Sequence, residues 1–162
     1  MNSKPILGIS GCLTGATVRF DGGHKRMAFI MDELAEWVSF KPVCPEMAIG
    51  LPTPRPALRL VNTTTGDVRL RFSQARDQDM TDQMEHFTED YLPSAADYAG
   101  FVVCAKSPSC GMERVRLYDE HGNRGAKAGI GLFTAALQQR YPWLPIEEDG
   151  RLHDPVLREN FV

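Results

Sequence analysis

The chain has little of what marks membrane proteins or strong binders of polyanions. It contains no apolar run of about 18 or more residues that could span a bilayer, and its start, residues 1–5, lacks the apolar core of a secretory signal. Its formal net charge is only -3, from 18 basic and 21 acidic residues, so no strong electrostatic signature for nucleic acid or an anionic membrane is visible, although a local basic patch stays compatible with it. We therefore expect a cytoplasmic protein with no membrane partner.

Cysteine is also scarce, and its spacing is wide. The 162 residues hold four cysteines, at positions 12, 44, 104 and 110, and no two of them form the Cys-x2-Cys pair typical of closed structural zinc sites. In a cytosolic protein such cysteines are more often reduced, metal-binding or catalytic than paired in disulfides. A chain of this length fits one domain, so we expect residues 1–162 to form a single unit with its own core.

What the chain does have is three apolar strand patterns that each lead into a cysteine. Residues 5–10 lead into Cys12, residues 40–43 into Cys44, and residues 100–105 into a loop that carries Cys110. In an open α/β sheet, ligands bind in the crevice outside the carboxyl ends of the strands. The pattern predicts an α/β fold with an open, mostly parallel, Rossmann-like sheet, helices on both faces, and a site at the C-terminal ends of the strands.

The other segments supply the expected framework. Periodicity predicts helices over residues 26–38, from Ser73 to Tyr91, and over residues 125–139, where Gly129 and Gly131 weaken the first turns unless another segment must approach closely. A β-hairpin is expected over residues 60–72, a strand over 114–118, a short edge strand over 145–148, and the start of a C-terminal helix or linker over 153–162. Residues 14–25 are glycine-rich and predict a loop, and the four prolines in residues 45–56 predict a stiff loop without a regular helix.

The four cysteines do not have equal claims to a site. Cys104 lies inside an apolar strand, and free cysteine there is most often a core residue. Cys12, Cys44 and Cys110 instead follow strands and have glycine, proline or serine beside them. Thiolates are soft ligands that suit both zinc and iron-sulfur clusters. Three thiolates from three separate loops favour a cluster whose fourth iron is left open.

Three sequence blocks resemble the signature blocks of the thiouracil desulfidase family, and they occur in the same order over nearly the whole chain. They are Ser-Gly-Cys-Leu-Thr-Gly at residues 10–15 with Val-Arg-Phe-Asp-Gly at 18–22, Val-Cys-Pro-Glu at 43–46 with Gly-Leu-Pro-Thr-Pro-Arg-Pro at 50–56, and Lys-Ser-Pro-Ser-Cys-Gly at 106–111. The chain departs from the family pattern at Gly11, where many members have alanine, and at Cys104, which has no counterpart among the family's three ligands. A fourth thiolate at Cys104 would close the open iron. Longer relatives carry a second domain, so we expect either a short stand-alone form or the first domain of a longer protein.

The resemblance implies an enzyme and assigns its parts. Cys12, Cys44 and Cys110 would hold a [4Fe-4S] cluster, with Glu46 and Ser107 as catalytic residues. The open iron would bind the sulfur of thiolated uracil (2-thiouracil, 4-thiouracil or 4-thiouridine nucleotides) and make the adjacent carbon more electrophilic. The implied reaction is a hydrolytic one that releases uracil and hydrosulfide and consumes no electrons.

Several side chains could bind the substrate. Arginine offers a bidentate fork for phosphate and lysine a point charge. The cations in or beside the three loops are Arg19, Lys25, Arg55, Arg59 and Lys106, and Ser109 is assigned to substrate binding with them. Each of these cations taken singly is as typical of a solvated surface.

Other readings remain open at this point. The same chemistry could act on 4-thiouridine in transfer RNA, which would make the chain an RNA modification enzyme. A different class is a non-catalytic, zinc-stabilised binding module that uses all four cysteines. A third is a thiol enzyme with Cys110 as nucleophile, although none of the four histidines, at 24, 86, 121 and 153, stands in a recognisable pairing with it.

Overall fold

A computed structural model describes six segments of the chain, residues 5–14, 36–51, 58–72, 78–104, 107–119 and 124–148. Of Cys12, Thr14 and Arg124 only the backbone is described. The expected loop at 15–25, the expected helix at 26–38 except its last three residues, the expected helix start at Ser73, and the C-terminal segment from 149 lie outside these segments. Within them, no helix is long and apolar enough to cross a membrane.

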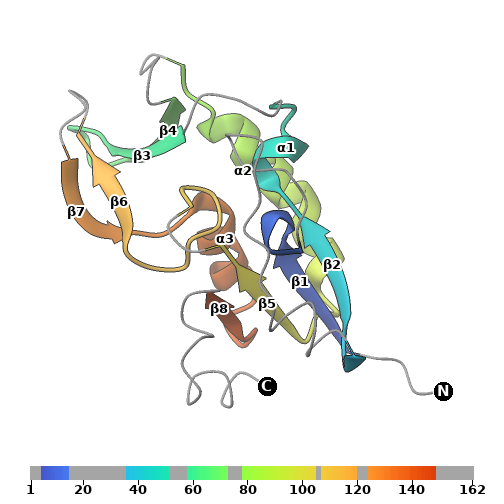
Figure 1. Cartoon of the computed structure of the whole chain (residues 1–162). Helices are drawn as coiled ribbons and strands as arrows, with labels where there is room; N and C mark the ends of the chain where they lie inside the picture. The colour runs from blue at the N-terminus through green and yellow to red at the C-terminus, as the bar shows by residue number, and fades with distance from the viewer. Residues whose placement is uncertain are drawn as a thin grey trace.

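The first sheet, sheet A, is parallel throughout. Its strands are β1 (Ile6–Ser10), β2 (Ser39–Val43), β5 (Gly100–Val103) and β8 (Ile146–Glu148), in the order β2-β1-β5-β8 (Figure 1). All four residues of β5 and the last four of β1 are buried, as expected for central strands of a parallel sheet with both faces covered. The predicted α/β class, the three strands that lead to cysteines and the edge strand near the C-terminus are confirmed.

A second sheet, sheet B, was predicted only in part. Its strands are β3 (Leu58–Asn62), β4 (Val68–Phe72), β6 (Val115–Tyr118) and β7 (Arg124–Gly129), in the order β4-β3-β6-β7. The β3–β4 hairpin is antiparallel, as expected, and turns at Gly66, whose φ is +89°. The strand predicted at 114–118 is β6, which pairs in parallel with β3 and antiparallel with β7. The union of hairpin and later strands into one sheet was not foreseen.

The helices lie against both sheets. They are α1 (Pro45–Ala48), α2 (Thr81–Tyr91) and α3 (Leu132–Arg140), with short 3-10 turns at Gly11–Thr14 and Leu92–Ala95. Phe133 of α3 is fully buried and its ring lies 5.6 Å from that of Phe101 in sheet A. Phe87 of α2 packs against the core of each sheet, so one aromatic side chain connects the two hydrophobic clusters.

Three predictions about local structure are wrong. The helix expected from Ser73 to Tyr91 begins only at Thr81, and Asp79 before it forms an isolated antiparallel bridge with Arg71. Residues 125–129 were expected to begin a helix and instead belong to β7, where a Cβ at Gly125 would lie 2.8 Å from the carbonyl oxygen of Leu117 on the neighbouring strand. Pairing with β6 outweighs the weak helical pattern there. The proline-rich segment was expected to hold no regular helix, yet Pro45 begins the four-residue α1. Proline is tolerated at a first helical position because its missing N–H would have no helical partner there.

Candidate functional site

The first side of the candidate site forms where β1 and β2 end. The two strands run in parallel register, with Ser10 opposite Val43, so Cys12 and Cys44 both follow within two residues of a paired position. Cys44 has an extended backbone and is half-buried, directly before α1. Glu46 lies in the first turn of α1 and is also half-buried. The ends of β1 and β2 thus bring the backbone of Cys12 near Cys44 and Glu46, which are the second predicted ligand and the predicted catalytic carboxylate.

The second side is the loop after β5, residues 107–111. The hydroxyl oxygen of Ser107 accepts the backbone N–H groups of Ser109 (3.2 Å) and Cys110 (3.1 Å), and the N–H of Gly111 donates to the carbonyl of Ser107 (2.9 Å). These bonds close a tight turn, which is a common role for serine. Cys110 at its end is 4% exposed and packs in the core of sheet A.

The start of α3 holds this loop in place. The N–H of Gly131 donates to the carbonyl of Gly111 (2.7 Å), and the N–H of Phe133 donates to that of Ser109 (2.9 Å). Thr134 donates its hydroxyl hydrogen to the carbonyl of Cys110 at 2.5 Å. A Cβ at position 131 would lie 2.4 Å from the carbonyl carbon of Ser109, so only glycine permits this approach. The sequence signal for this close packing was Gly131, which was expected to let another segment approach. Nothing in the sequence indicated the contact made by Thr134.

A hydrogen bond joins the two sides. The hydroxyl of Ser109, which is 1% exposed, donates to Oε2 of Glu46 at 3.2 Å, across 63 positions of sequence. Burial raises the pKa of the Cys110 thiol well above its ordinary value, a hydrogen bond with Ser10 lowers it, and the nearby Cys104, Cys44 and Glu46 raise it further. Two further thiols and a carboxylate therefore lie near enough to Cys110 to affect its thiol. A set of soft sulfur donors of this kind suits a thiophilic metal.

Cys104 and Ser10 lie next to Cys110. Cys104 is buried, as predicted for a core residue, and its N–H donates to the hydroxyl oxygen of Ser10 at 3.0 Å. The sequence predicted no role for Ser10, yet its side chain contacts both Cys104 and Cys110. The fourth thiol is thus a neighbour of the site.

The remaining predicted site residues are only partly placed. The side chain of Cys12 lies outside the described part, as do four predicted substrate-binding cations, Arg19, Lys25, Arg55 and Lys106. Among the side chains that are described, no group of three or more histidine, cysteine or acidic residues is arranged to hold a metal ion. Arg59 lies elsewhere, on β3 of sheet B, with its guanidinium 4.2 Å from the centre of the Tyr118 ring.

Comparison with known proteins gives two matches to the chain. A family model described as 2-thiouracil desulfurase matches residues 7–149. The fold is similar to that of a solved [4Fe-4S]-dependent thiouracil desulfidase, TudS, with a TM-score of 0.73 and 27% sequence identity, over 99% of this chain and 100% of that one. No curated protein matches.

Proposed function

Since the chain belongs to the 2-thiouracil desulfurase family, we propose that it is an iron-sulfur-dependent desulfidase that replaces the sulfur of a thiolated uracil with oxygen. The observation that carries the proposal is the Ser109–Glu46 hydrogen bond, which fixes the family's expected carboxylate against the loop of Cys110. The similarity to TudS over the whole chain supports the same conclusion. The substrate is a small thiolated pyrimidine, as the free base or as a nucleotide.

The residues that would hold a [4Fe-4S] cluster are Cys12, Cys44 and Cys110. The fit is chemical: two of these thiols, with Cys104 beside them, influence one another from separate loops, and sulfur is the donor that such clusters require. When bound, the cluster would supply a thiophilic Lewis acid with one iron left open to the substrate. Cys104 is proposed to remain a core thiol beneath it.

Glu46 is the proposed general base. Its Oε2 accepts the hydrogen bond from Ser109, which orients the carboxylate that takes a proton from water. That water attacks the ring carbon that carries sulfur, its oxygen bonds to the carbon, and the carbon–sulfur bond breaks. The two protons of the water are released with the sulfur as hydrosulfide and one proton. Thiouracil and water thus give uracil and hydrosulfide, and no electrons are consumed.

Ser107 is proposed to position the substrate or the attacking water. Its hydroxyl oxygen already accepts two backbone N–H groups, which fills both lone pairs. The O–H hydrogen is then the part of the side chain that can donate to a uracil oxygen, a ring nitrogen or a water. Arg19, Lys25, Arg55 and Lys106 are proposed to bind the phosphate of a nucleotide substrate, as their place in or beside the three loops suggested.

The test is anaerobic purification followed by visible absorption, by iron, sulfide and zinc analysis, and by assay of 2-thiouracil and 4-thiouridine monophosphate. We expect brown protein with about four irons and release of sulfide. Glu46→Gln should keep the iron and lower the rate roughly 10²- to 10⁴-fold, whereas Glu85→Gln, a change on the exposed face of α2, should leave the rate unchanged. Colourless protein with stoichiometric zinc, or a Glu46→Gln variant with full activity, would overturn the proposal.

A further inference from the structure

The two faces of sheet B differ completely in chemistry. On the inner face Leu60 and Leu70 are fully buried and pack in the second hydrophobic cluster. Side chains alternate along strands, so the residues next to these leucines point to the opposite, outer face. That face carries Arg59 and the buried Val61 on β3, Arg69 and Arg71 on β4, and Arg116 and Tyr118 on β6. The outer face of sheet B is therefore built mainly from cations.

The strand register aligns these cations. Arg59 pairs with Arg71 across β3 and β4, and Arg116 pairs with Lys127 across β6 and β7. The register of Leu60 with Leu117, carried one residue back, sets Arg59 beside Arg116. In the strand order β4-β3-β6-β7 the result is one basic row that crosses the whole sheet: Arg71, Arg59, Arg116 and Lys127. At about 4.8 Å between strands, the row is roughly 14 Å long.

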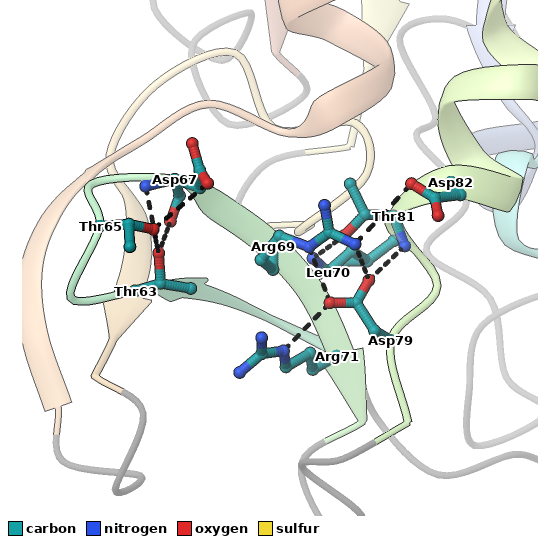
Figure 2. A network of polar contacts seen from close by, with 9 residues as sticks. All are labelled: Thr63, Thr65, Asp67, Arg69, Leu70, Arg71, Asp79, Thr81 and Asp82. Carbon is teal, nitrogen blue, oxygen red and sulfur yellow. Dashed lines mark hydrogen bonds and ion pairs between the residues drawn. The ribbon is translucent and has the colours of Figure 1, made fainter.

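One end of the outer face is fixed by a shared carboxylate. Asp79 accepts hydrogen bonds from Nε (2.8 Å) and Nη2 (3.1 Å) of Arg69 and from Nε of Arg71 (3.1 Å), as Figure 2 shows. Asp82 approaches Arg69 at 3.7 Å from its exposed position on α2. Two guanidinium groups thus share one half-buried carboxylate, and Asp82 adds a second, more distant negative charge.

The rest of the basic row is held without acids. The Arg59 guanidinium lies over the ring of Tyr118, and Nη1 of Arg116 donates to the carbonyl of Gly125 at 2.7 Å. Over the described residues, no carboxylate pairs with Arg59, Arg116 or Lys127. Like charges placed directly opposite in a sheet are destabilising. The Tyr118 ring orients Arg59 and the carbonyl of Gly125 orients Arg116, so both guanidinium groups are available to a ligand with several negative charges.

We propose that the outer face of sheet B binds the phosphodiester backbone of a nucleic acid, with successive phosphates along the basic row. Guanidinium groups match phosphate in a bidentate way, and the row's length suits a chain of phosphates better than a single one. The overall charge of -3 is compatible with this, because Asp79 and Asp82 lie only at the β4 end of the face and further exposed acids lie along α2, at Glu89 and Asp90. The inference stands apart from the proposed desulfidase activity, since it uses none of the site residues.

The test is fluorescence anisotropy of a labelled single-stranded polyuridine oligonucleotide with protein purified anaerobically, over a series of salt concentrations. With about 0.7 counterions released per single-strand phosphate, four contacts give a slope of log K against log salt near -3. Arg59→Gln with Lys127→Gln removes two cations that leave no carboxylate behind, so the slope should become shallower by about 1.4. Lys127→Gln alone, at an exposed position, should change it by about half as much and keeps the test valid if the double variant fails to fold.

Matched variants separate position from total charge. Lys41→Gln with Arg140→Gln removes two exposed cations from other elements and should leave the slope unchanged, as should the charge-conserving Arg59→Lys with Lys127→Arg. No saturable binding at low salt, or equal weakening by both charge-removing pairs, would overturn the proposal. So would salt-sensitive self-association that Glu85→Lys abolishes, because the row's ligand would then be the acidic helix of a second copy. Desulfidation of free 2-thiouracil in the same samples shows separately whether the proposed function fails.

Discussion

Sheets A and B use their strands in opposite ways. In β5 of sheet A the adjacent residues Phe101 and Val102 are both fully buried, so the strand has no free face. In β4 of sheet B, Leu70 is fully buried while the side chain of Arg71 beside it is 22% exposed. A strand that is buried on both faces can present chemistry only where it ends, whereas a half-buried strand can present it along its length. The cysteine site lies at the ends of the buried strands of sheet A, and the basic row crosses the half-buried strands of sheet B.

The largest expected effects on the free energy of unfolding come from alanine substitutions on both faces of β5 in sheet A and of β4 in sheet B. Phe101→Ala should lower the free energy of unfolding by about 3–5 kcal/mol because it removes a ring from the aromatic core, and Val102→Ala on the other face by about 2 kcal/mol. In sheet B, Leu70→Ala should cost about 2–5 kcal/mol but Arg71→Ala less than about 1 kcal/mol. Urea unfolding of the four variants measures this. A negligible cost at Val102 would show that sheet A also has one dispensable face.

Gly131→Ala tests whether the loop of residues 107–111, which follows β5 of sheet A, depends on close packing with the start of α3. A methyl group would meet the backbone of Ser109 and displace the loop, so we expect a loss of about 1–3 kcal/mol together with less bound iron. Thr134→Val keeps the side chain's size and removes only the bond to the carbonyl of Cys110, at about 1 kcal/mol. Unfolding curves and iron content of both are the measurements. Full iron content in Gly131→Ala would mean that the loop is held by other contacts.

Asp79→Asn tests the network on the face of sheet B, with an expected effect of about 1.5 kcal/mol at neutral pH. Partial burial would raise the pKa of Asp79, but hydrogen bonds from Arg69, Thr81 and Arg71 outweigh it and hold that pKa well below its ordinary value. A depressed pKa in the folded state gives stability that is complete above about pH 4 and is lost as the pH falls further. Unfolding from pH 7 down to pH 2 should narrow the difference in stability between wild type and variant.

Asp97→Asn, at an exposed site outside this network, is the matched control. It should change the free energy of unfolding by the same small amount at every pH. A constant difference between wild type and Asp79→Asn down to pH 2 would show that the carboxylate's charge contributes nothing.

The sequence predicted the parts of the fold that depend on local pattern. Apolar runs located β1, β2, β5 and β8, and the alternation of Leu60 to Phe72 located the hairpin. It failed at residues 125–129, because the strand identity of β7 comes from β6 beside it and not from its own glycines and alanines. The nearness of Cys44 to Cys110 was expected from the topology of parallel strands, and the convergence of Cys12 with them stays a prediction. The roles of Ser10 and Thr134 could not be predicted, since each depends on a contact made across the fold.

The burial of Cys110 has a consequence for how the protein matures. Its side chain packs with Phe133 and Leu137 in the core, so on the proposed assignment one atom is at once a metal ligand and a part of the hydrophobic interior. A thiol in that position can be reached by an incoming cluster only before the interior closes or during a local opening of the loop. On that assignment cofactor insertion would be tied to the folding of the chain, and a variant that closes its core faster than it is supplied with iron would accumulate as folded, empty protein.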